Sequence, residues 1–186
     1  MKMNLTQILA LVDMNKPLYD ARRREKQLGF MQDFEAYISD HEGVHNHEVK
    51  RNRYRIEHAV ALATFQSLVA RGLPTAEADY IVGNQFSALI VADRDNLVDF
   101  DPTEIGSADP YHIGAIYFSD ARKLHLGGPA SRCIAMFKDH LLEGQCAILD
   151  GKKNDIKFCT PTELILVNVT ETYRNLRARL LDGLGL

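Results

Sequence analysis

The spacing of apolar residues changes near residue 84 and divides this 186-residue sequence into two parts. Before that point, apolar side chains recur three and four residues apart, which is the period of a half-buried helix. After it, short runs of consecutive apolar residues are bounded by turn residues and are typical of strands. We therefore predict an α+β protein, with an all-helical domain over 1–84 and a small α/β domain over 85–186 that ends in a helix.

Proline and glycine punctuate the helical first part. Pro17 suits the first turn of a helix, and the pattern that follows it stops near Gly29. A longer apolar pattern ends at Gly72, where the chain can take the left-handed conformation that often closes a helix. The predicted helices are 5–12, 17–28, 55–71 and a short fourth helix that begins at Pro74.

Turn signals organise the second part. The dipeptide Asp150-Gly151 supplies the positive φ values of a tight hairpin. Thr170 is a suitable N-cap for the last helix, and Gly127-Gly128-Pro129 has the composition of a loop. The predicted elements are strands at 86–92, 112–118 and 164–169, a hairpin over 146–159, and helices at 129–143 and 170–181.

Positive charge is concentrated in two short segments of a chain whose net charge is −3. The segment 16–26 holds five basic residues against two acids, and the segment 50–55 holds four basic residues and no acid. Two compact basic clusters on a mildly acidic chain predict a local site for a polyanion.

A short helix, a tight turn and a second helix with three consecutive arginines form the arrangement that a helix-turn-helix requires. The first helix braces the second, which lies in the major groove with its N-terminal half toward base edges. Arginine suits this surface because its planar fork bonds guanine bidentately and also grips phosphate. The second basic cluster precedes the third helix and is placed to hold neighbouring phosphates, which adds affinity without reading sequence.

Three short motifs follow the helix-turn-helix in order. The pair Gly29-Phe30 ends the arginine-bearing helix, Arg53-Tyr54-Arg55-Ile56 leads into the third helix, and Arg71-Gly72-Leu73-Pro74-Thr75 joins the third helix to the fourth. Together these features resemble the DNA-binding domain of MerR proteins, the winged helix-turn-helix transcription regulators of bacteria. The resemblance covers residues 4–83 and does not extend into the second part.

The resemblance implies a sequence-specific DNA-binding transcription regulator, with the helix 17–28 in the major groove and 85–186 as a dimerisation or effector domain. The implied partners are double-stranded DNA, a second copy of the chain, and RNA polymerase or a regulatory protein. We expect base contacts from Arg22, Arg23 and Lys26. The candidate DNA-binding residues are Lys16, Tyr19, Arg22, Arg23, Arg24, Lys26, Lys50, Arg51, Arg53, Tyr54 and Arg55.

A second interpretation is a protein–protein interaction adaptor whose basic helix meets an acidic partner. An enzyme is not expected, because the sequence lacks the nucleophile elbow Gly-x-Ser-x-Gly, the phosphate-binding Gly-x-x-x-x-Gly-Lys-Ser/Thr and a Gly-x-Gly-x-x-Gly after a strand. We accordingly expect no catalytic residue and no cofactor.

The segment His41-Glu42-Gly43-Val44-His45 formally matches the zinc metalloprotease motif. Its internal glycine and polar flanks leave no apolar helix face to bury such a site, so we interpret it as a polar loop. A non-catalytic metal site of His41, His45 and His47 stays open as an alternative. The three cysteines are widely spaced and predict reduced core thiols, with metal or redox sensing as the alternative: Cys133, Cys146 and Cys159.

The sequence also bears on the compartment. No run approaches the ~20 apolar residues that a membrane helix needs. The first residues reach Asp13 after a short apolar stretch, and no small-residue cleavage site follows them. We predict a cytoplasmic protein without a membrane partner.

Overall fold

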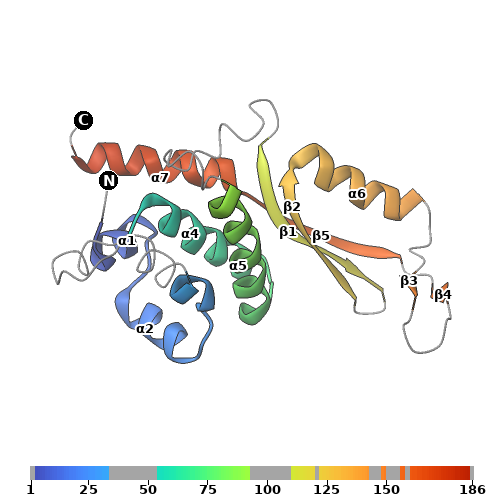
Figure 1. Cartoon of the computed structure of the whole chain (residues 1–186), viewed down its shortest axis with the longest axis horizontal. Helices are drawn as coiled ribbons and strands as arrows, with labels where there is room; N and C mark the ends of the chain where they lie inside the picture. The colour runs from blue at the N-terminus through green and yellow to red at the C-terminus, as the bar shows by residue number, and fades with distance from the viewer. Residues whose placement is uncertain are drawn as a thin grey trace.

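The structure is a computed structural model and describes residues 3–33, 54–92, 110–119, 122–142, 148–149, 156–157 and 160–184. Figure 1 shows a helical half on one side and a sheet with one covering helix on the other. The helical half contains α1 (Leu5–Leu11), α2 (Lys16–Arg24), α4 (Ile56–Ala70) and α5 (Thr75–Ala92). The remainder contains β1 (Tyr111–Phe118), β2 (Lys123–Pro129), α6 (Ala130–Leu142), β3 (Ile148–Leu149), β4 (Ile156–Lys157), β5 (Pro161–Asn168) and α7 (Val169–Leu184).

The mixture of helices with a small antiparallel sheet confirms the coarse prediction of an α+β fold. Most predicted elements are present, with ends shifted by a few residues. These are the helices 5–12, 55–71, 129–143 and 170–181, the strands 112–118 and 164–169, and the hairpin within 146–159, of which β3 and β4 form the paired part.

The strand predicted at 86–92 is wrong, because these residues continue helix α5. Ala78, Ile81, Val82 and Phe86 are fully buried and are spaced as one face of a helix. A run of consecutive apolar residues does not distinguish a buried helix from a buried strand, and here the helical spacing of buried residues reaches Phe86, the first residue of the run.

The loop predicted at 127–129 is also wrong, because these residues form the end of strand β2. Ile113 pairs with Gly127, and Tyr111 pairs with Pro129, in the antiparallel ladder between β1 and β2. Pro129 is tolerated as the last residue of a strand at the sheet edge. Strand pairing, which composition does not reveal, overrides the turn preference of these residues.

Two helix ends differ from their predictions. Helix α2 ends at Arg24 instead of residue 28, and Lys26 beyond it has the left-handed φ of 57°. Helix α7 is capped by Asn168, whose Oδ1 accepts the N–H of Glu171 at 2.8 Å. Thr170 is the second residue of the helix, where its hydroxyl oxygen accepts the N–H of Tyr111 at 2.9 Å.

The three-stranded sheet has the order β2-β1-β5 and is antiparallel throughout. Because side chains alternate along each strand, the sheet presents two faces. Helix α6 covers one face, where Cys133 packs with Ile116, Phe118 and Leu126. The other face faces the helical half.

That second sheet face shares one hydrophobic core with the helices. Ile113 and Ala115 of β1 and Ile165 and Val167 of β5 join the core built by α1, α2, α4, α5 and α7. The predicted domain boundary at residue 84 therefore falls inside α5, and residues from both predicted ranges contribute to the same core.

Helix α5 lies along strand β2, and the two elements contact each other at two points. Glu77 contacts Lys123 at one end of the helix, and the Gln85 side chain lies against Gly127 further along. Eight helical residues rise ~12 Å and four strand residues extend ~13 Å, so the two elements stay in register along this length.

Strand β5 passes so close to Gly114 of β1 that we expect a larger residue at this position to destabilise the sheet. A Cβ there would collide with the backbone carbonyl oxygen of Ile165, so Gly114→Ala forces β1 and β5 apart. We expect the free energy of unfolding to fall by about 3 kcal/mol, measured by chemical denaturation. Gly183→Ala is the control, because nothing lies within 4 Å of its added Cβ. An equal response of the two variants would contradict this packing.

Candidate nucleic-acid interface

Helices α1 and α2 are joined by a short, well-capped turn. Asn4 caps α1 by accepting the N–H of Gln7 at 2.9 Å, and the Gln7 side chain accepts the N–H of Asn4 in return. Asn15 caps α2 by accepting the N–H of Leu18 at 2.8 Å. Between the helices, Asp13 has a φ of 54°, a left-handed conformation that Asp tolerates better than most residues. The sequence thus specifies both helix starts and the reversal between them.

The inward face of α2 holds two of the predicted DNA-binding residues. Tyr19 is 0% exposed and lies in the core. The Arg22 guanidinium lies over the Phe65 ring of α4, 5.3 Å from its centroid. Its Nε and Nη1 atoms are shielded from solvent and have no hydrogen-bond partner among the described residues. Tyr19 and Arg22 are three residues apart and so share one helix face, which makes both anchors of α2 and corrects their assignment as DNA contacts.

The outward side of α2 is basic toward its C-terminal end. Arg24 and Lys26 are exposed, while Arg23 is partly buried. Lys16, also exposed, pairs with Asp20 at 2.5 Å, which reduces the net charge of the first turns. Successive helical residues are ~100° apart, so the three consecutive arginines point in different directions and cannot act as one group.

The second basic cluster is only partly within the described residues. Lys50, Arg51 and Arg53 lie outside them. Tyr54 is 3% exposed and forms an antiparallel bridge with Met3, with hydrogen bonds of 2.7 and 3.0 Å. It is therefore packed beside the start of α1 and is not an exposed DNA contact, whereas Arg55 is partly buried at the start of α4.

The residues that follow α2 are tied to α5. The N–H of Phe30 donates to Asp79 Oδ1 at 3.1 Å, at the start of the helical turn formed by residues 29–33. Gly29 permits this approach, since a Cβ there would lie 3.0 Å from Asp79 Oδ2. A small residue is favoured at this point because a Cβ would crowd the Asp79 carboxylate.

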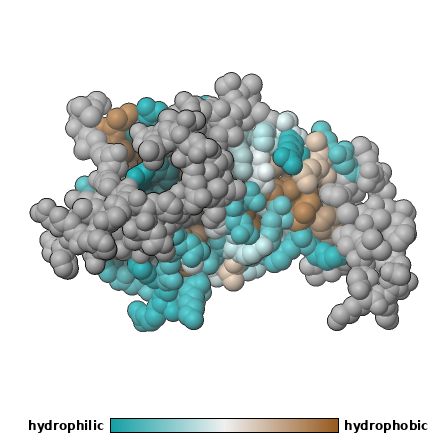
Figure 2. All heavy atoms as spheres, in the orientation of Figure 1, coloured by the Kyte–Doolittle hydropathy of each residue, from teal (hydrophilic) through white to brown (hydrophobic). Residues whose placement is uncertain are grey.

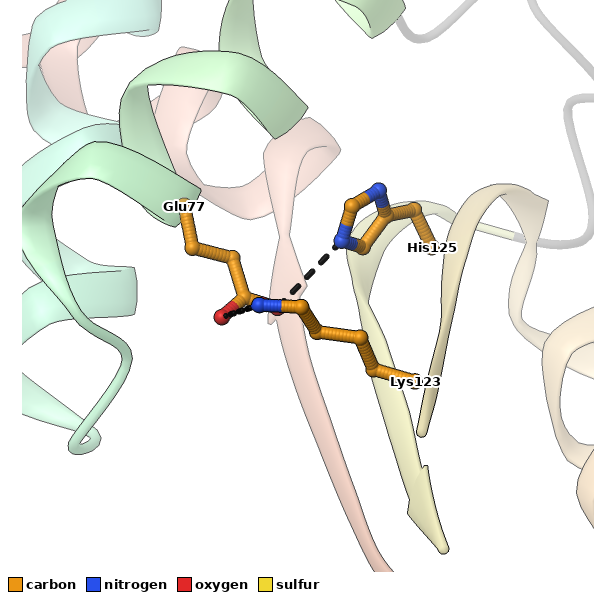
Figure 3. Close-up of polar contacts among 3 residues, drawn as sticks. All are labelled: Glu77, Lys123 and His125. Carbon is orange, nitrogen blue, oxygen red and sulfur yellow. Dashed lines mark hydrogen bonds and ion pairs between the residues drawn. The ribbon is translucent and has the colours of Figure 1, made fainter. Parts of the chain in front are cut away.

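A second polar cluster holds α5 on the sheet, as Figure 3 shows. The Glu77 side chain is 5% exposed and contacts Lys123 Nζ at 2.5 Å and His125 Nε2 at 3.2 Å. Burial raises the pKa of Tyr117 to about 12, assisted by the charge of Glu77, by a hydrogen bond to it and by the charge of Glu163. The Tyr80 ring lies 5.3 Å from the His125 ring. The carboxylate is thus surrounded by donors and fastens α5 to β2.

Sequence reasoning missed this cluster for a definite reason. Glu77 is 46 residues from Lys123 and 48 from His125, and β2 itself was not predicted. The alternation of Lys123 and His125 in a strand would have been the only local signal, since residues two apart share a sheet face.

The other candidate sites give little chemistry. Within the described part of the chain, no three His, Cys, Asp or Glu side chains form a group that could hold a metal ion. The segment containing His41, His45 and His47 lies outside the described residues, as do Cys146 and Cys159. Cys133 is a buried thiol on the face of α6 that packs against the sheet, in agreement with a core role.

Comparison with protein-family models, curated proteins and solved structures finds no match to this chain. In the described residues, no helix combines the length and apolar character that crossing a membrane demands. The function must therefore be inferred from the surface chemistry of the site itself.

Removing the charge of Glu77 should loosen α5 from the sheet. Glu77→Gln leaves Lys123 and His125 without their anionic partner, and we expect unfolding to become easier by about 2 kcal/mol. Glu171→Gln is the matched control, because Glu171 also lies in the first turn of a helix but is exposed. Thermal and urea denaturation should separate the two variants; similar losses would show that Glu77 acts only through the helix dipole.

The raised pKa of Tyr117 predicts a loss of stability in alkali. In the unfolded chain its pKa returns to 10.0, so between pH 10 and 12 the folded state retains a proton that the unfolded state has released. Stability is therefore complete below pH 10 and declines toward pH 12. Subtracting the unfolding free energies of Tyr117→Phe from those of the wild type should isolate this decline, and a flat difference would refute it.

Proposed function

We propose that the protein is a sequence-specific DNA-binding transcription regulator in which α2 enters the major groove. The observation that carries this proposal is the two-sided character of α2: Tyr19 and Arg22 anchor its inner face, while Arg24 and Lys26 are exposed at its outer end. A basic helix held firmly from behind is what a groove-binding element requires.

The direction in which α2 faces also supports the proposal. In Figure 1, α5 lies between α2 and the sheet, so α2 is on the side away from the α/β half. Figure 2 shows hydrophilic side chains gathered at the lower left, where α2 lies in Figure 1. Arg24 and Lys26 on this side of the molecule are exposed.

The dimensions and side chains of α2 suggest which of its residues contact bases and which contact phosphates. An α-helix with its side chains is ~10–12 Å across, which fits the ~12 Å width of the major groove. Leu18 near its start is 40% exposed, and an apolar side chain there can contact a thymine methyl group. We assign Leu18 to base edges, and Arg24 and Lys26 to phosphates, whereas Lys16 is paired with Asp20.

A homodimer belongs to this proposal. One helix-turn-helix reads a short half-site, and a two-fold dimer doubles the contacts on a palindromic operator. RNA polymerase or a regulatory protein is then the further partner of a bound regulator.

Exposed cations also suit the alternative of an adaptor for an acidic protein partner, and the test must separate the two. The purified chain is used to select fragments from genomic DNA, and binding to an enriched fragment is measured by fluorescence anisotropy. Enrichment of a common motif supports regulation. Binding that acidic polypeptides displace more readily than duplex DNA, or no enriched motif, would overturn it.

The phosphate role of the outer end of α2 predicts a specific change in salt dependence. The double variant Arg24→Ala/Lys26→Ala should bind about tenfold more weakly at ~0.1 M salt, on all duplexes alike. The slope of log Kd against log salt should fall by about 1.8, which is ~0.9 for each lost phosphate contact. Arg174→Ala on the exposed side of α7 is the control and should match wild type. If the double variant and Arg174→Ala show equal slopes of log Kd against log salt, α2 does not contact the DNA phosphates.

A further inference from the structure

The C-terminal helix α7 reaches back to the turn between α1 and α2. It follows β5 directly and packs along α4 and α1, as Figure 1 shows. Arg179 Nη1 donates to the carbonyl oxygen of Leu11 at 3.2 Å and to Asp13 Oδ2 at 2.5 Å. Both acceptors belong to the few residues that determine the direction in which α2 leaves α1.

The charge of Arg179 suits that position. The last carbonyls of a helix lack intrahelical partners and carry partial negative charge, so a cation there is favourable. Leu11 is the last residue of α1, and the carboxylate of Asp13 adds further negative charge to the same end. Arg179 compensates both, and it lies beside a residue whose left-handed φ of 54° forms the turn.

Helix α2 is therefore held at both ends. Asp79 of α5 accepts the N–H of Phe30 just beyond its C-terminal end, and Arg179 holds the turn just before its N-terminal end. The first contact lies within the helical half. The second comes from a helix that begins where strand β5 ends, at Asn168 and Val169.

We propose that Arg179 is a positioning residue for α2: it fixes the turn from which α2 projects, and so makes DNA affinity depend on how α7 is seated. This inference rests on the proposed function. The same contact lets the sheet regulate DNA binding. A ligand or partner that displaces β5 or α7 would move the Arg179 guanidinium away from Leu11 and Asp13, and so release the turn before α2.

The Arg179–Asp13 ion pair is too exposed to contribute much to global stability, which distinguishes a positioning role from a structural one. The Arg179 side chain is 55% exposed and that of Asp13 is 74% exposed. Solvent-exposed ion pairs of this kind contribute little to global stability. Loss of Arg179 should therefore leave the fold intact and act locally on the turn.

Hydrogen exchange of the full-length chain without DNA is the primary test. The N–H groups of Asp13 and Met14 are bonded to Ala10 and Leu9 within the turn. In Arg179→Ala they should exchange about fivefold faster, with no change in the amides of β1. Arg174→Ala is exposed on the same helix and should behave as wild type. Arg179→Lys keeps the charge but not the planar fork, so it should restore protection only in part.

The DNA arm uses the fragment that wild type binds. Arg179→Ala should bind it about fivefold more weakly, at the lower end of known coupling effects, while Arg174→Ala binds normally. Unchanged exchange in the turn overturns the inference, and so does faster exchange that extends equally into β1. If the exchange result is as expected but wild type binds no duplex, only the proposed function fails.

Discussion

The docking of α5 on the sheet, with its apolar face toward β1 and its polar contacts to β2, is the contact on which the rest of the structure depends. It joins an apolar helix face to a sheet, and it closes at one end with a buried carboxylate, Glu77, among the donors Lys123 and His125. A buried charge is tolerated only when it is paired, so this cluster fixes a single alignment of helix and strand. Because α5 also carries Asp79, the same helix that meets the sheet holds the segment after α2.

In the proposed regulator, one side of α2 stabilises the fold and the other side binds DNA. The inner face of α2 supplies an aromatic anchor, Tyr19, and a cation placed on the Phe65 ring. The outer end, with Arg24 and Lys26, makes little contribution to the core and is available to a polyanion. Arg22 and Arg24 thus serve different purposes, which follows from the ~100° rotation between neighbours on a helix.

Sequence periodicity anticipated most of the helices and strands, because each buried face repeats with the period of its element. It failed where tertiary pairing decides the conformation. The apolar run 86–92 reads equally well as strand, and Gly127 became part of a strand only through its pairing with β1. For the site, the basic helix was predictable from composition, whereas the inward turn of Arg22 and the contacts of Glu77 and Arg179 depend on residues distant in sequence.

The junction between β5 and α7 has a consequence of its own. The strand ends at Asn168 and the helix begins at Val169, so no linker absorbs a change in length between them. The rotational phase of α7 is set by the sheet, and one added residue would turn the helix by ~100° about its axis. Chain length at this single junction, as much as side-chain chemistry, decides which residue of α7 meets the helix-turn-helix.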